Sequence, residues 1–88
     1  MSREKPSRKD KILSRQLGDE WLLYDEKNGS VHIINSVAEF VWRMCDGSHT
    51  LANIEDETQK AFSVPDGVTL RKDLEGIIQQ FFDIGVIA

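Results

Sequence analysis

The chain has 88 residues, which is enough for one domain with a modest core. Its single cysteine, Cys45, excludes an internal disulfide and favours a reducing compartment, so we expect a cytoplasmic protein. No stretch has the length of a membrane span, and the net charge of −4 makes a phosphate backbone a poor partner.

The charge is unevenly distributed along the chain. Residues 1–11 carry five basic and two acidic side chains, whereas the remaining residues carry a net charge of −7. The first eleven residues are polar and show no periodicity, so we expect a flexible basic arm over 1–11 and a single domain over 12–88. An acidic body suits a basic or neutral peptide partner better than a nucleic acid.

The first half of the domain predicts three antiparallel strands, over Ile12–Leu17, Glu20–Asp25 and Val31–Asn35. The pair Asn28-Gly29 predicts a tight type I′ turn between the second and third strands, because that turn needs positive φ twice. The alternation leaves open which side of the last strand is buried, since each side carries an isoleucine.

A helix is expected to follow the third strand at once. Ser36, followed three residues later by Glu39, predicts a capping box. The helix should run over about 37–45 with an apolar inner stripe, leaving Glu39 and Arg43 facing water. Asp46-Gly47 should end it.

Two further helices are predicted. The second begins near Thr50 as N-cap, with an inner face made of Leu51, Ile54, Thr58, Ala61 and Phe62. After a break at Ser63–Gly67, the third runs over about 68–83, with a buried stripe made of Leu70, Leu74, Ile77 and Phe81. Beside that stripe lie Ile78 and Phe82, which either face a ligand or pack under the hairpin in a wider core. The order β-β-β-α-α-α predicts an α+β domain of the winged helix-turn-helix kind.

From Trp21 onward the chain resembles the PqqD family of pyrroloquinoline quinone (PQQ) biosynthesis. It equally resembles related domains that recognise precursor peptides of ribosomally made, post-translationally modified peptide (RiPP) pathways. The resemblance rests on the order and spacing of short pieces: Ile34-Asn35, Trp42, Asp46-Gly47, Thr50-Leu51-Ala52-Asn53-Ile54, Asp73-Leu74 and Gly85-Val86-Ile87. Ile34 departs from the family, in which leucine is commoner at that position.

The resemblance implies a non-catalytic adaptor that presents the leader segment of a precursor peptide to a modifying enzyme. The leader adds as an extra strand in a cleft between the third strand and the third helix. Carried over to this chain, the peptide-binding residues are Val31, His32, Ile33, Ile34 and Asn35 on the strand, and Arg71, Glu75, Ile78 and Phe82 on the helix. The implied partner enzyme is a radical S-adenosylmethionine protein or a leader peptidase. No cofactor is implied.

Two other classes of function fit the sequence less well. DNA binding would use Arg71, Lys72, Gln79 and Gln80 on the third helix, but acidic residues of the same helix would repel phosphates. An enzyme is not expected, because no nucleophile–base pair, phosphate loop or metal-ligand spacing occurs, and His32 is an isolated histidine. An unpaired edge strand also allows a homodimer, in which two copies pair along it.

Overall fold

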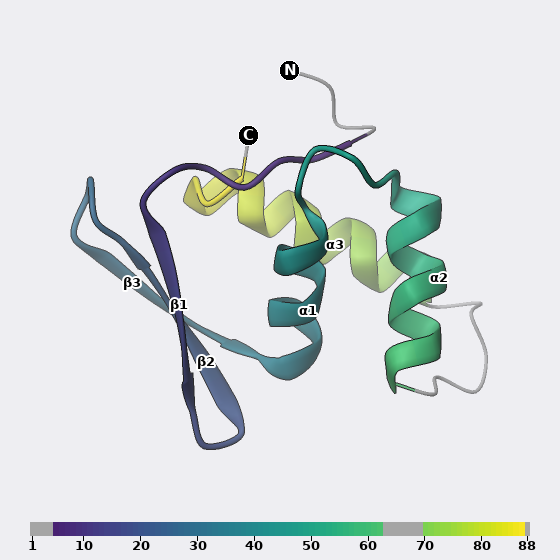
Figure 1. The fold of residues 1–88 in the computed structure, drawn as a ribbon, viewed down its shortest axis with the longest axis horizontal. Helices are drawn as coiled ribbons and strands as arrows, with labels where there is room; N and C mark the ends of the chain where they lie inside the picture. Colours follow the sequence, from purple (N-terminus) through teal and green to yellow (C-terminus); the bar gives the residue numbers. More distant parts are fainter. Residues whose placement is uncertain (1–4, 63–69, 88) are drawn as a thin grey trace.

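The computed structural model describes residues 5–62 and 70–87. Three strands, β1 (Ile12–Leu17), β2 (Glu20–Asp25) and β3 (Ser30–Asn35), precede three helices, α1 (Ser36–Met44), α2 (Leu51–Phe62) and α3 (Leu70–Ile84). The sheet stands on one side of the molecule and the helices on the other (Figure 1). The predicted α+β order is therefore confirmed. The predicted break at 63–67 and the start of the third helix at residue 68 lie outside the described residues.

The sheet is antiparallel, in the order β1-β2-β3. Gly18, at the first position of the two-residue turn between β1 and β2, has a φ of 61°, as a type II′ turn requires. The turn joins Leu17 to Glu20, which are paired in the register. The register then continues without a break through β2 to β3, so β3 forms one edge of the sheet.

The turn between β2 and β3 is not the predicted type I′ turn. Gly29 has a positive φ of 70°, but Asn28 does not. The Asp25 carboxylate instead accepts hydrogen bonds from the backbone N–H groups of Lys27 and Asn28 at 3.0 and 3.2 Å, and from Nδ2 of Asn28 at 2.9 Å. An aspartate that bonds the backbone ahead of it stabilises a wider loop, which explains why the tight turn does not form.

Helix α1 begins one residue earlier than predicted. Oδ1 of Asn35 accepts a hydrogen bond from the Ala38 N–H at 2.8 Å, so Asn35, and not Ser36, is the N-cap. Glu39 takes no part in a capping box and does not face water. It is 2% exposed, and its carboxylate binds Nε of Arg43, one turn along the helix, at about 3 Å. Asn35 thus ends β3 and starts α1 with no residue between them.

Helix α2 begins where predicted. Oγ1 of Thr50 accepts from the Asn53 N–H and Oδ1 of Asn53 accepts from the Thr50 N–H, both at 3.2 Å, which is a reciprocal N-terminal cap. The predicted inner face holds for its first two turns but is wrong at Ala61 and Phe62, which are exposed. The Phe62 ring packs edge-on against Phe40 of α1, 5.5 Å between centroids.

Helix α3 ends at Gly85, as predicted. Gly85 has a φ of 79° and its N–H donates to the Phe81 carbonyl at 3.0 Å. The core gathers buried apolar side chains from β2, all three helices and the C-terminal residues: Leu23, Ala38, Val41, Trp42, Cys45, Ile54, Leu70, Leu74, Ile78, Phe81, Val86 and Ile87. One face of the sheet therefore packs on the helices through α1.

Residues 6–9 are packed against the domain, and the predicted free arm does not hold for them. Pro6 is fully buried. The Arg8 N–H donates to the Cys45 carbonyl at 2.7 Å and the Lys9 N–H to the Val86 carbonyl at 3.2 Å, while the Arg8 guanidinium lies 5.4 Å from the centre of the Trp42 ring. Figure 1 shows this segment crossing the end of the domain beside the C-terminus.

Candidate functional site

The outer edge of β3 is open in the described part of the chain. β3 pairs with β2 on one side, and the sheet order places no strand on the other. Ser7 and Arg8 form isolated bridges with Asp46 and Ile87, and not with β3. The main-chain groups along this edge are therefore available to a further strand.

The register identifies which residues of β3 present those groups. A two-residue turn closes on a hydrogen-bonded pair, here Leu17 and Glu20, and bonded and non-bonded positions then alternate along each strand. Alternate residues of β2, beginning with Glu20, thus point their main-chain groups at β1, and those between them point at β3. Counting across the ladder, His32 and Ile34 bond to β2, whereas Val31 and Ile33 direct their N–H and C=O groups at the open edge.

Side-chain burial on β3 follows the same alternation and settles which side is buried. Val31 and Ile33 are 52% and 51% exposed on the outer face of the sheet. His32 and Ile34 are half-buried on the inner face, toward the helices. Nε2 of His32 is buried without a hydrogen-bond partner among the described residues. An unpaired buried nitrogen of this kind costs about 1–3 kcal/mol.

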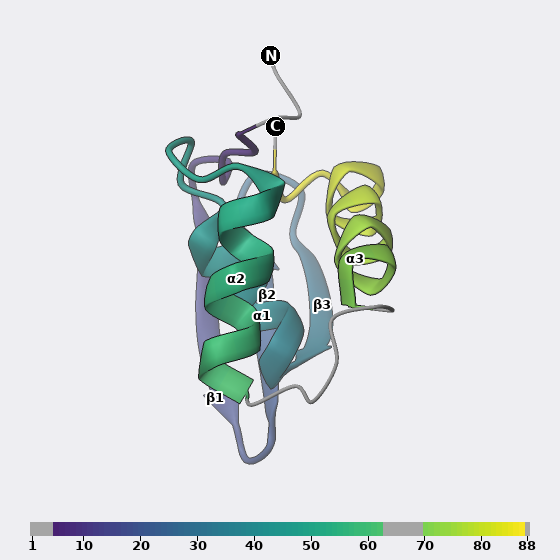
Figure 2. The same cartoon turned by 90° about the vertical axis from the view of Figure 1, so that its right-hand side faces the viewer.

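Helix α3 lies beside this edge. Figure 2 shows it on the side of β3 that faces away from β1. The Cα atoms of α3 and β3 stay more than 8 Å apart, so the main chains of the helix and the strand are not in contact. A strand added to β3 at the usual spacing of about 4.8 Å would run on the side of β3 where α3 lies.

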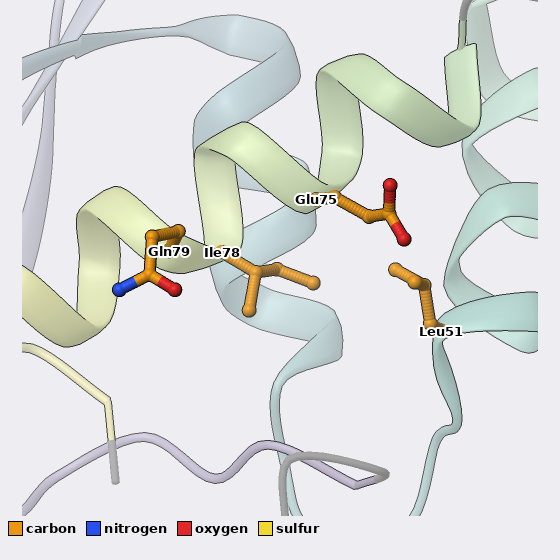
Figure 3. A pocket seen from close by; sticks show the side chains of 4 residues that line it. All are labelled: Leu51, Glu75, Ile78 and Gln79. Carbon is orange, nitrogen blue, oxygen red and sulfur yellow. The ribbon is translucent and has the colours of Figure 1, made fainter.

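Three of the four α3 residues expected from the sequence to line this cleft, Arg71, Glu75 and Ile78, lie on the flank of α3 next to α2. Nη2 of Arg71 binds Oε1 of Glu55, on α2, at 2.9 Å. Glu75 and Ile78 line a hollow of about 260 Å³ together with Gln79 and with Leu51 of α2 (Figure 3). This flank therefore faces α2 and not β3.

Ile78 is also a core residue. It is 8% exposed and belongs to the same apolar cluster as Leu74, and Phe82 is half-buried against that cluster. The second apolar pair of α3 thus widens the core, which was one of the two interpretations that the sequence left open.

The opposite flank of α3 carries different side chains. At 100° per residue, Ile77 lies 100° from Ile78 around the helix, and Ile84, seven residues further, returns to within about 20° of Ile77. Both are half-buried and pack against the edge of the core. Neither residue stands out in the sequence, because Ile77 fits the periodicity of the predicted buried stripe.

Two groups at the end of α1, the Cys45 thiol and the Asp46 carboxyl, have shifted pKa values. Burial raises the pKa of the Cys45 thiol to about 12, so it stays protonated at neutral pH. Hydrogen bonds from Ser48 and His49 lower the pKa of Asp46, which lies in an exposed loop. Within residues 5–62 and 70–87, no group of three or more His, Cys, Asp or Glu side chains is placed to hold a metal ion. No described helix is long and apolar enough to cross a bilayer.

Comparisons with known proteins agree with this fold. The model of the family described as "Coenzyme PQQ synthesis protein D (PqqD)" matches residues 20–87. The fold is similar to that of a solved structure described as "TbiB1 in Complex with the TbiA(beta) Leader Peptide", with a TM-score of 0.75 and 20% sequence identity over 92% of this chain and 93% of that chain. No curated protein matches the chain in sequence.

Proposed function

This chain belongs to the PqqD family, and we propose that it binds the leader segment of a ribosomally made precursor peptide and presents the peptide to a modifying enzyme. The pathway is PQQ biosynthesis or a related RiPP pathway. The observation that carries the proposal is the open edge of β3, with the main-chain groups of Val31 and Ile33 directed away from the sheet. The structural relative TbiB1, which is described in complex with a leader peptide, supports it.

The leader adds as a fourth strand. Main-chain hydrogen bonds to Val31 and Ile33 supply affinity that is independent of sequence, and side-chain contacts supply specificity. We retain Val31–Asn35 as the receiving strand. We replace the α3 wall expected from the sequence, because Arg71 and Ile78 are engaged with α2 and the core, and assign it to Ile77 and Ile84.

Inward-facing side chains of the leader meet His32 and Ile34 from one side and Ile77 and Ile84 from the other. Three of these four are aliphatic and all are half-buried, so the groove favours apolar leader side chains at alternate positions. His32 adds a polar group to this groove, since its Nε2 has no hydrogen-bond partner in the described part of the chain.

The protein acts as an adaptor, and the chemistry belongs to its partner, a radical S-adenosylmethionine enzyme or a leader peptidase. Nothing favours a DNA-binding regulator. The Arg71 guanidinium, expected to face DNA in that alternative, is held by Glu55, and Asp73, Glu75 and Asp83 make the exposed face of α3 acidic.

Titration of ¹⁵N-labelled protein with synthetic leader peptides tests the proposal. The peptides are taken from short open reading frames next to the gene, with a scrambled peptide as control. We expect a dissociation constant in the micromolar range or tighter and chemical-shift changes concentrated on Val31–Asn35, Ile77 and Ile84. Changes confined to α2 and the Leu51–Ile78 hollow would place the binding site elsewhere.

A further inference from the structure

A short N-terminal segment lies across the end of the molecule at which α3 stops and β3 starts. Residues 6–11 run there from the loop between α1 and α2 to the first residue of β1 (Figure 1). The family model begins to match at residue 20, so this segment lies outside the part of the chain that defines the family. We call residues 6–11 the N-terminal tie.

One end of the tie is fixed to α1 and to the loop that follows this helix. The carbonyl of the buried Pro6 accepts a hydrogen bond from the Gly47 N–H at 3.0 Å. The Arg8 N–H donates to the Cys45 carbonyl at 2.7 Å, and the Arg8 guanidinium lies 5.4 Å from the centre of the Trp42 ring. A guanidinium is attracted by the negative face of an indole ring. Both the main chain and the side chain of Arg8 therefore hold the tie on α1.

The other end of the tie joins α3 to the sheet. The Lys9 N–H donates to the Val86 carbonyl at 3.2 Å, two residues beyond the end of α3 at Ile84. Two residues further along the tie, the Lys11 carbonyl accepts from the N–H of Glu26 at 3.0 Å, in the loop that leads into β3. The short stretch from Lys9 to Lys11 thus links the end of α3 to the start of β3.

The main chains of α3 and the sheet do not meet elsewhere. Cα atoms of α3 come within 8 Å of α1 and α2, but not of any of the three strands. A hollow of about 130 Å³ lies between Gly85 and Asp25, and Lys9 and Asp10 of the tie are also in its lining. The tie therefore spans the gap at this end of the cleft, next to Ile84, which we assign to the α3 wall.

We propose that the N-terminal tie sets the distance between β3 and the C-terminal end of α3, and so keeps the leader cleft at the width that an added strand needs. The inference rests on the proposed function. It makes Arg8 a positioning residue, which acts through Trp42 and the main chain and not by contact with the leader. A leader strand must bond to β3 and contact the α3 wall at the same time. If the cleft has the required width for only a fraction of the time, the apparent dissociation constant rises by the inverse of that fraction.

Lengthening the tie tests the inference without removing any of its contacts. Two glycines inserted after Asp10 leave residues 6–9 able to pack as before, but slacken the link between α3 and the sheet. The same insertion after the exposed Lys5, ahead of the tie, is the matched control. We expect the Asp10 insertion to raise the leader dissociation constant roughly five- to tenfold, which corresponds to a cleft of the required width for about 10–20% of the time. The Lys5 insertion should match the wild type.

A substitution that keeps the length of the tie provides independent evidence. Arg8→Ala removes the guanidinium from Trp42 and should weaken leader binding, whereas Arg8→Lys keeps a cation at that position and should restore most of the affinity. This comparison decides the matter if circular dichroism shows that the Asp10 insertion does not fold. Leader affinity equal to that of the wild type in both Arg8 variants would then overturn the inference.

A distance measurement separates positioning from stability. Spin labels at Arg15→Cys on β1 and Gln80→Cys on α3, both exposed positions, report the separation of the sheet from the helix in a Cys45→Ala background. The distribution of distances should be broader in the Asp10 insertion than in the wild type and should narrow when the leader binds. A role in stability alone would lower the free energy of unfolding without broadening this distribution.

The outcomes distinguish this inference from the proposed function. If the leader fails to bind the wild-type protein, the proposed function fails. If the leader binds the wild type and the two insertions change its affinity equally, or not at all, the tie inference is overturned and the proposed function stands. A folded Asp10 insertion with an unchanged distance distribution would also overturn it, because the tie would then not set the separation.

Discussion

Replacing Ile33 with proline probes the open edge of β3 most directly. Proline lacks the backbone N–H, and the Ile33 N–H points at the edge where the leader is proposed to add, not at β2. Proline is tolerated on an edge strand when its missing donor faces outward. Ile33→Pro should therefore keep the fold and lose one hydrogen bond to the peptide.

The expected effect follows from the number of bonds. Val31 and Ile33 together offer two N–H and two C=O groups, and a net contribution of about 1 kcal/mol each gives roughly 4 kcal/mol from the ladder. That is about half of the binding free energy at a micromolar dissociation constant. Removing one donor and leaving a peptide carbonyl unpaired costs about 1–3 kcal/mol, so the dissociation constant should rise roughly 5- to 150-fold.

Ser14→Pro is the matched control. By the same counting, Ser14 directs its N–H at the opposite edge of the sheet, on β1, so this proline removes an equivalent donor far from the leader. Isothermal titration calorimetry should give wild-type leader affinity for Ser14→Pro, with circular dichroism confirming both folds. Equal weakening by the two variants, or none by Ile33→Pro, would refute strand addition at β3.

Three further predictions concern the helices and the core. Ile78→Asp places a charge in the core and should lower the free energy of unfolding by several kcal/mol in urea titrations. Ile77→Asp should lower the free energy of unfolding by less but weaken leader binding. If Ile77→Asp were the more destabilising and Ile78→Asp the more damaging to leader binding, the wall would lie on the α3 flank expected from the sequence. Asn35→Ala removes the N-terminal cap of α1 and should lower the free energy of unfolding by about 1 kcal/mol, whereas Asn35→Ser should largely keep it. An unchanged free energy of unfolding in urea titrations of Asn35→Ala would show that the cap is unimportant. Burial raises the pKa of the Cys45 thiol to about 12, so the unfolded chain loses this proton first as the pH rises. The contribution of the neutral thiol to the free energy of unfolding is therefore intact below about pH 9 and is lost progressively up to pH 12. Cys45→Ala should flatten the decline of unfolding free energy over that range, and an unchanged slope would contradict the assignment.

The strands and helices were predictable because their apolar periodicities are strong and their boundaries carry turn and cap residues. Errors arose where two local interactions compete for the same groups. Asn28-Gly29 is a strong turn signal, but Asp25 binds the backbone ahead of it and widens the loop. Ser36 and Asn35 are both good caps, and the order of two adjacent cap residues does not reveal which one is used.

The edge position of β3 was predictable from the sequence, but the flank of α3 that lies nearest to it was not. The sequence shows that α3 has two apolar directions, yet the helix packing decides which of them meets α2. The ion pair between Arg71 and Glu55, which lie sixteen residues apart in the chain, is a long-range contact of this kind and cannot be read from local sequence. The packing of Pro6 and Arg8 is another, since their partners Gly47, Cys45 and Trp42 lie about forty residues further along the chain.

Asn35 joins β3 to α1 without a connecting loop, and this has a consequence for the energetics of capture. A strand that is anchored at its end to a core helix has little conformational entropy to lose when a leader peptide binds. Almost all of the entropic cost of binding therefore comes from ordering the peptide. Lengthening this corner by one or two glycines would give the host its own entropy to lose. Affinity would then fall even though every contacting atom was still present.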